Sequence, residues 1–162
     1  MALNADGKRG FGIWVTHLET KTTKLLYRAD SSLRLIGWSL ADESLIFANP
    51  SGKTSRTQPI TVKLSGVSVK TNAVNWIAEL PFTYYLNIHL SPDRYTLAYV
   101  TRQDEKDNLW ILSLRGGSKK KLTANNDPRL YFSSLAWAQG SQAIYFGKQA
   151  RHNLLSMITN FK

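Results

Sequence analysis

The chain has 162 residues, a hydrophobic content of 43% and a formal net charge of +10. This size and composition are typical of one globular domain and exclude an intrinsically disordered chain. The absence of cysteine excludes disulfides, thiolate metal ligands and cysteine nucleophiles, and no apolar stretch approaches the roughly 18 residues of a membrane-spanning helix.

Short apolar and β-branched segments, separated by polar turn residues, predict a chain built entirely of strands. Ser65-Gly66 is interpreted as a turn between two of these strands, and the segment 102–107 as a hairpin loop. No amphipathic helix of 12 residues or more is indicated, and 154–161 is the one segment considered for a helix. In chain order, the strands are expected at 11–18, 24–28, 33–39, 44–48, 59–64, 67–70, 84–90, 95–101, 108–114, 119–123, 131–138, 142–146 and 153–158.

Two sequence patterns recur along the chain. The first is centred on Trp14, Val62 and Trp110, and each step between them is 48 residues. Interleaved repeats of this period predict a propeller or a related array, whose units bury their faces only against neighbouring units. The second pattern, a strand–turn–strand unit, begins at Trp38, Leu90 and Trp137.

A propeller blade typically has four antiparallel strands, which is the number predicted for each repeat unit. We therefore expect a single domain, 1–162, with a partial blade at 1–30, blades at 31–74 and 82–124, and an incomplete blade at 129–162. Closed propellers usually have about four to eight blades. The chain is expected to form a partial ring of three to four blades, completed by a second copy or by strands of a longer protein.

The central repeat carries a more specific signature. The segments 90–93 and 97–99 match a strand–turn–strand motif of the form W-S-P-D-G-K-x-[IL]-[AV]-[FY], and 108–111, Gly116-Gly117 and 122–123 match the segment that follows it. On these motifs the chain resembles the TolB-type, WD-like β-propeller repeat family. The other copies are degenerate, because Ala41-Asp42 and Gln139-Gly140 stand where the motif has Pro-Asp.

Several residues of the repeats are expected to be structural. Asp93 is placed to accept a hydrogen bond from the backbone N–H two residues on, which fixes the hairpin. Gly116 and Gly117 are expected to supply the positive φ of a tight turn. The tryptophans at repeat positions are expected to pack between adjacent blades; these are Trp14, Trp38, Trp110 and Trp137.

The sequence predicts no catalytic residue, metal site or cofactor. The three histidines, His17, His89 and His152, lie in different repeats without ligand spacing, and no nucleophile elbow is present. The segment 51–54 resembles the end of a phosphate-binding loop. However, Phe47 occupies the position of its first glycine, so this segment is interpreted as a polar connection between strands.

Recognition residues are expected in the loops, which carry most recognition on repeat scaffolds. One loop holds Lys53 and Arg56, and the hairpin tip at 102–107 holds Arg102 and Asp104. A further basic cluster is interpreted either as a solvated surface or as an anion-binding face; it consists of Lys119, Lys120 and Lys121.

The resemblance implies a non-enzymatic interaction or sensor module, because proteins similar to TolB use such propellers as protein-docking platforms in the bacterial envelope. It also implies the C-terminal part of a larger bacterial protein, such as a membrane-anchored transcriptional regulator with a winged-helix domain. The alternatives are the propeller of a prolyl-oligopeptidase-like peptidase or another enzyme, and nucleic-acid or polyanion binding by the basic surface. A protein partner is expected first and a ring-completing homodimer second. No targeting signal is evident, so periplasm and cytoplasm both stay open.

Overall fold

The computed structural model describes residues 2–3, 9–39, 43–51, 60–82 and 87–150, and all regular structure in them is β. The described residues contain no helix long and apolar enough to cross a membrane. The strands are β1 (Ala2–Leu3), β2 (Arg9–Thr16), β3 (Thr23–Ala29), β4 (Arg34–Trp38), β5 (Ser44–Ser51), β6 (Ile60–Ser68), β7 (Val74–Phe82), β8 (Ile88–Leu90), β9 (Thr96–Gln103), β10 (Lys106–Ser113), β11 (Lys119–Lys121), β12 (Leu130–Trp137) and β13 (Ile144–Ala150).

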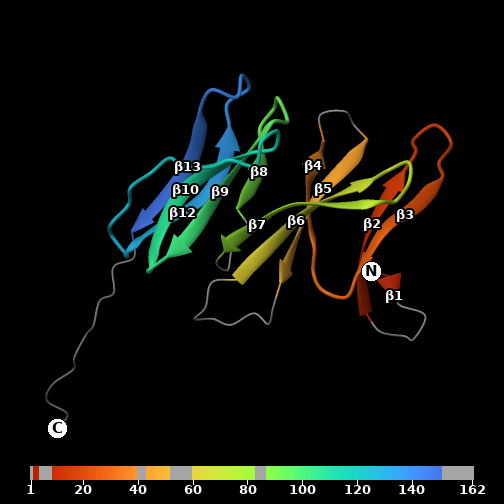
Figure 1. The fold of residues 1–162 in the computed structure, drawn as a ribbon, viewed down its shortest axis with the longest axis horizontal. Helices are drawn as coiled ribbons and strands as arrows, with labels where there is room; N and C mark the ends of the chain where they lie inside the picture. The colour runs from red at the N-terminus through yellow and green to blue at the C-terminus, as the bar shows by residue number, and fades with distance from the viewer. Residues whose placement is uncertain (1, 4–8, 40–42, 52–59, 83–86, 151–162) are drawn as a thin grey trace, which may run out of the picture.

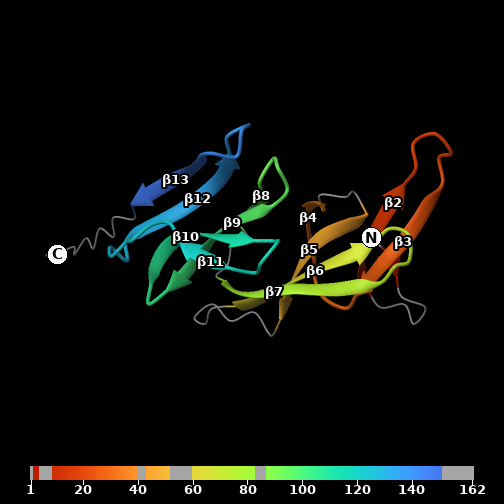
Figure 2. The ribbon, with the colours of Figure 1, turned by 45° about the horizontal axis from the view of Figure 1, so that its top comes forward.

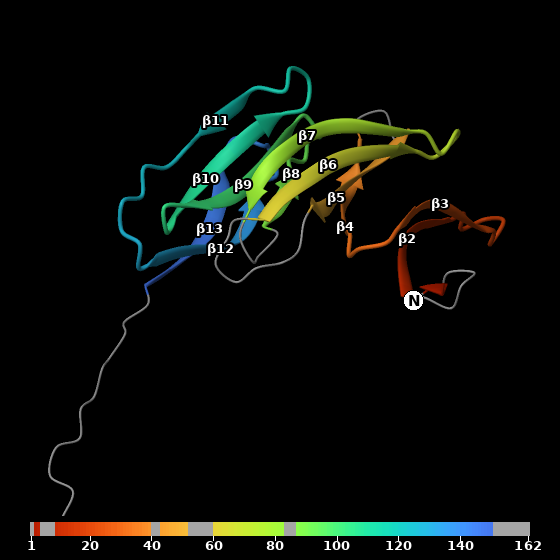
Figure 3. The ribbon, with the colours of Figure 1, turned by 60° about the horizontal axis from the view of Figure 1, so that its bottom comes forward.

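These strands form four antiparallel sheets that follow one another along the chain. The first sheet has the order β1-β2-β3, the second β4-β5-β6-β7, the third β8-β9-β10-β11, and the fourth consists of β12 and β13. Figure 1 shows the sheets side by side from the N-terminal to the C-terminal end. Figures 2 and 3 show from two further directions that the second sheet lies between the first and the third. The all-β, antiparallel blade architecture is confirmed, as a partial propeller with no closed sheet in the described residues.

The second sheet is buried on both faces because its side chains alternate along each strand. Phe47 faces the first sheet and packs in one cluster with Ile13 and Leu26. Its neighbour Ala48 faces the third sheet and packs in another cluster with Tyr99. A third cluster joins the third and fourth sheets through residues such as Val100, Leu109 and Phe132. Each sheet therefore buries its apolar faces only against its neighbours, as expected of a propeller array.

Hydrogen bonds also join the third sheet to the fourth. The backbone N–H of Asp93 donates to Ser141 Oγ over 3.2 Å, and Trp137 Nε1 donates to the carbonyl of His89 over 3.0 Å. Both pairs are 48 residues apart, one residue more than the 47 that separate equivalent positions such as Ser91 and Ala138.

The expected turn at Ser65-Gly66 is wrong. β6 runs without interruption from Ile60 to Ser68 and is paired on both sides. The sheet then turns at residues 69–73 and ends with β7, which sequence reasoning missed. Consequently the second sheet extends to Phe82, beyond the limit of 74 expected for this blade. A β-bulge between Leu64 and Ser65, together with the glycine, gave this strand interior the appearance of a turn.

The segment 102–107 is also shorter as a loop than expected. β9 continues to Gln103 and β10 begins at Lys106, so only Asp104 and Glu105 form the turn. Both have positive φ, 47° and 61°, which is the backbone geometry of a two-residue type I′ hairpin. The strand expected at 153–158 and the helix considered at 154–161 lie outside the described residues.

The structure also corrects the register of the first repeat pattern. Phe47 pairs with Ser65 in the second sheet, and its counterpart Tyr99 pairs with Trp110 in the third. The residue equivalent to Trp110 is therefore Ser65 rather than Val62. The repeat length varies because β9 and β10 are joined by a two-residue turn, whereas a longer segment lies between β5 and β6.

Candidate binding cleft between the second and third sheets

The interface between the second and third sheets contains a cleft of about 400 Å³. Its floor is apolar and is formed by Ile46, Gly66 and Ile77 of the second sheet, with Leu114 opposite them. Both Ile77 and Leu114 also pack against the buried cluster between these sheets. The cleft is therefore continuous with the inter-sheet core, at the end of the interface where that core stops.

The cleft exists because a glycine occupies a position that holds a large apolar side chain in the third sheet. Ile46 of β5 pairs with Gly66, and the equivalent residue Ala98 of β9 pairs with Ile111. Ile111 packs against the cluster between the third and fourth sheets. No side chain projects at Gly66, so the corresponding volume stays open.

In the first sheet, too, the position equivalent to Gly66 holds an apolar side chain. β2 has a bulge after Ile13, and β6 has a bulge at the equivalent place after Leu64. Two residues further along stand Val15 in β2 and Gly66 in β6, and Val15 packs against the cluster between the first and second sheets. The interface that holds this cleft therefore has a glycine at the position where the first and third sheets have Val15 and Ile111.

A Cβ atom on Gly66 would meet Ile77 Cδ1 and Ser44 Cβ at 3.8 Å each. These are ordinary van der Waals distances, and the backbone of Gly66 has no positive φ that would demand glycine. Glycine at this place is therefore required neither by backbone strain nor by close approach. It leaves room without being needed for the fold.

The polar wall of the cleft is the β4–β5 turn. Ser39 and Ser44 close this turn, because the Ser39 N–H donates to the Ser44 carbonyl over 2.8 Å and the Ser44 N–H donates to Ser39 Oγ over 3.2 Å. Asn75 of β7 also lines the cleft with an exposed side chain. β7 is the last strand of its sheet, so the cleft opens beside a strand edge that no other described strand pairs.

Three residues of the third sheet form the mouth of the cleft: Arg94, Tyr95 and Arg115. Arg94 has a φ of 62° and reaches across the interface, where its Nη1 donates to the Ser39 carbonyl over 3.3 Å. The carbonyl of Tyr95 accepts the Leu114 N–H over 2.8 Å, which ties the two turns of the third sheet together. The mouth is thus held by hydrogen bonds from both sheets.

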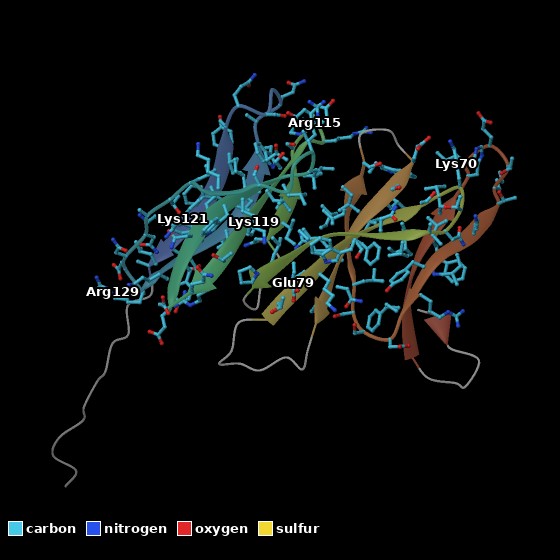
Figure 4. The ribbon with its side chains drawn as sticks, viewed as in Figure 1. Lys70, Glu79, Arg115, Lys119, Lys121 and Arg129 are labelled. Carbon is cyan, nitrogen blue, oxygen red and sulfur yellow. The ribbon has the colours of Figure 1, made fainter. Side chains whose placement is uncertain are left out.

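Arg115 lies over the aromatic face of Tyr95, with its Cζ 3.5 Å from the ring centroid. Such stacking fixes the plane of a guanidinium and leaves the N–H groups at its edge able to donate. The part of the chain that the structure describes gives Arg115 no ion-pair partner within salt-bridge distance. Figure 4 places Arg115 at the upper end of the interface, above Lys119 and Glu79.

Asp93 lies beside this mouth and has the structural role expected from the sequence. Its Oδ1 accepts hydrogen bonds from Ser91 Oγ at 2.6 Å and from the Tyr95 N–H at 3.0 Å, which confirms the expected bond to the residue two positions on. These two bonds, with a smaller effect from the positive charge of Arg115, lower the pKa of Asp93. Asp93 therefore stabilises the turn that carries Arg94 and Tyr95.

The predicted recognition residue Arg102 is held inward by the next interface. Its Nη1 pairs with Asp107 Oδ1 at 2.9 Å, and its Nη2 donates to the Pro128 carbonyl at 3.1 Å. The guanidinium also lies 4.3 Å from the ring centroid of Tyr131. Asp107 is buried, and its Oδ2 accepts the Phe132 N–H over 2.8 Å. This network joins the third and fourth sheets, so the solvated hairpin expected here has a buried base.

The other predicted recognition residues that the structure describes do not line the cleft. Asp104 is exposed at the tip of the β9–β10 hairpin. Lys53 and Arg56 fall outside the described residues. Lys119 Nζ donates to the Glu79 carbonyl over 2.7 Å, between the outer strands of two sheets (Figure 4). The side chains of β11 are all exposed along the edge of the third sheet; they are Lys119, Lys120 and Lys121.

The tryptophans at repeat positions differ in burial. Trp110 packs against the cluster between the second and third sheets, and Trp137 packs against the cluster between the third and fourth. Trp14 and Trp38 are 49% and 37% exposed, and neither is among the residues that pack against the three buried clusters. In the turn after β10, Gly117 has the positive φ that was expected, 67°, whereas Gly116 does not.

No group of three or more His, Asp or Glu side chains that could hold a metal occurs in the described residues. His89 is half-buried, and burial, with a smaller effect from Arg34, lowers its pKa. Its carbonyl already accepts the Trp137 indole N–H. His89 is therefore part of the packing between sheets.

Antiparallel four-stranded meanders that stack face to face are blades of a β-propeller. Among solved structures, TolB from Acinetobacter baumannii is similar to this chain, with a TM-score of 0.57 and 15% identity over 82% of the chain. A second structure, assigned as TolB from Agrobacterium tumefaciens, matches over 84% of the chain and 68% of its own length at 12% identity. Its TM-score of 0.30 is too low to carry an argument.

The chain spans 31% of the Acinetobacter baumannii protein. At this identity the similarity shows the shared fold. No protein-family model matches the sequence, and no curated protein sequence matches it.

Proposed function

We propose that this chain is a non-enzymatic interaction module of the TolB-like β-propeller type, which binds a protein partner. The observation that carries the proposal is the cleft above Gly66, an open apolar hollow of about 400 Å³ between two otherwise closely packed sheets. Hollows of this size with a few placed polar groups are typical of recognition sites. The apolar floor supplies burial, and the arginines at the mouth supply orientation.

The wider context expected from the sequence belongs to the same proposal. A partial array of blades fits a module of a larger bacterial protein, and the membrane-anchored winged-helix regulator suggested by the sequence resemblance is one such protein. The similarity to one part of TolB from Acinetobacter baumannii is compatible with this context. In that setting the module would sense a partner, and any DNA binding would reside in another domain.

The test is partner capture followed by measurement with purified components. The full chain is immobilised and exposed to proteins from the organism of origin, and each recovered protein is then purified and titrated into the chain by calorimetry. We expect a saturable 1:1 isotherm with a negative heat-capacity change, because apolar surface is buried on binding. The absence of any saturable partner would contradict the proposal.

A second copy of the chain is the other candidate partner. The fourth sheet has two described strands where the second and third have four. A second molecule could extend the fourth sheet if residues 11–16 of its β2, which β1 does not pair, lay along the outer edge of β13, since open strand edges favour such pairing. Light scattering over a dilution series tests this directly: a mass near twice 18.3 kDa supports a homodimer, and a constant monomer mass excludes it.

A further inference from the structure

We propose that the cleft above Gly66 binds an acidic peptide segment of the partner, with one apolar side chain seated over Gly66 and an adjacent carboxylate on Arg115. This inference rests on the proposed function and adds the chemistry of the segment that is recognised. It is argued from the missing side chain, from the charge at the mouth and from the open edge of β7.

The size of the apolar subsite follows from the other two interfaces. At the position of Gly66 they hold Val15 and Ile111, whose side chains pack into the inter-sheet clusters. A partner side chain that enters beside Ile46 and Ile77 would occupy the equivalent volume. A branched aliphatic or aromatic side chain fits this place, because it restores the packing that the neighbouring interfaces already have.

Arg115 determines which charge the partner group at the mouth of the cleft would carry. Its guanidinium is stacked on Tyr95 at 3.5 Å, and the described residues offer it no carboxylate within salt-bridge distance. The nearby Asp93 is engaged through its Oδ1 with Ser91 and the Tyr95 N–H. A stacked arginine with an unused edge is suited to bidentate binding of a carboxylate.

A peptide suits the cleft because β7, one of the strands that line it, has an outer edge that no other described strand pairs. Asn75 and Ile77 of this strand line the cleft, and β7 is the last strand in its sheet. Main-chain groups of an extended segment can pair with such an edge while alternate side chains enter pockets. One extended segment could therefore place an apolar side chain over Gly66 and an acidic side chain beside Arg115.

The experiment presents the full chain to a phage library of random dodecapeptides and measures synthetic copies of the enriched sequences by fluorescence anisotropy. We expect enriched peptides to carry Asp or Glu beside Leu, Ile, Phe or Trp. Their affinity should fall about tenfold or more for Gly66→Ile, which fills the cleft, because an excluded apolar side chain costs at least about 1.4 kcal/mol. Arg115→Gln should also weaken binding by about tenfold, through loss of a charge-assisted pair.

Arg129→Gln is the matched control. Arg129 is an exposed arginine that pairs with Asp127 at 3.0 Å, and Figure 4 places it at the far end of the third and fourth sheets. Its removal lowers the net charge by the same amount and should leave affinity within about twofold. A thermal melt of each variant confirms that it is folded. If Gly66→Ile does not fold, Arg115→Gln still tests the inference.

Enriched peptides without a carboxylate, or with affinity unchanged by both cleft variants, would overturn this inference. A library that enriches no acidic peptide would overturn it as well. In each case a partner that binds saturably in calorimetry would still support the proposed function through another surface. If the chain has no saturable partner at all, the proposed function itself is contradicted. The failure of this inference and the failure of the proposed function are therefore distinguishable.

Discussion

The interface between the third and fourth sheets is filled, whereas the interface between the second and third is left partly open. In the filled interface Ile111 packs against the cluster around Phe132, and Asp107 joins the two sheets through a buried ion pair and a backbone hydrogen bond. In the open interface Gly66 stands in place of Ile111, and the cleft remains. One side-chain position in a shared fold thus distinguishes a filled interface from one that holds a cleft.

The largest expected effect is on the packed part of the open interface. Trp110→Ala should lower the free energy of unfolding by about 3 kcal/mol, because it truncates a large side chain that packs between the second and third sheets. Trp76 lies in β7, the last strand of the second sheet, and is 70% exposed. Trp76→Ala should therefore cost less than about 1 kcal/mol. Equal losses in urea denaturation would show that Trp110 has no special role between the sheets.

The comparison can be inverted by opening the filled interface. Ile111→Gly should create a cavity there and cost about 2–3 kcal/mol, from lost packing and the lower strand propensity of glycine. Denaturant unfolding of the purified variant provides the measurement. A cost below about 1 kcal/mol would mean that the position of Ile111 is not equivalent to a core position.

The buried ion pair of the filled interface is the next target. Asp107→Asn should cost about 2 kcal/mol, since Arg102 loses its charge partner and the Phe132 N–H loses a strong acceptor. Asp104→Asn removes an exposed carboxylate in the same hairpin and should change stability by less than about 0.5 kcal/mol. Thermal melts of both variants at matched pH give the comparison, and equal shifts would contradict it.

Closing the cleft should have a smaller effect of opposite sign. Gly66→Ile should stabilise the chain by about 1 kcal/mol, because the added side chain fills open volume and glycine is unfavourable within a strand. The same denaturation experiment measures the gain. A clear loss of stability would show that the hollow is needed by the fold rather than available to a ligand.

The smallest effect concerns the turn that carries the mouth of the cleft. Asp93→Ala should cost about 1 kcal/mol near neutral pH, since the carboxylate accepts bonds from Ser91 and the Tyr95 N–H. The folded-state pKa of Asp93 is lowered, so this stabilisation is present above the unfolded pKa of about 3.9 and is lost as the pH falls through the folded value. The stability difference between the two proteins should therefore be constant near neutral pH and shrink as the pH falls below about 3.9. A difference that does not shrink there would assign the effect to another cause.

Local patterns predicted most of the strands. Alternating apolar residues and turn formers mark β2, β3, β5, β9, β10 and β12 almost where the structure places them. The motif around Asp93 also predicted its hydrogen bond to the Tyr95 N–H. These features depend on neighbours within a few residues, so a sequence contains the information directly.

Features that depend on distant residues were not predicted. Ser65-Gly66 has the composition of a turn, yet β5 and β7 pair with both sides of it and keep it extended. Arg102 and Asp107 looked like solvated loop residues, because the backbone N–H of Phe132 and the ring of Tyr131 come from another sheet. No signal in the sequence indicated the cleft, although an alignment of Gly66 with Ile111 by strand pairing would have revealed the missing side chain.

The sequence by itself determined that this protein is a series of antiparallel strands with a repeated turn, because alternation and turn chemistry act within one hairpin. The tertiary structure decided which glycine is a turn and which is a hollow, and which charged residues are surface and which join two sheets. The physical reason is that the burial of a side chain depends on both of the sheets that face each other at an interface. The side chain missing at Gly66 becomes a cleft only when Arg94, Tyr95, Leu114 and Arg115 stand opposite it.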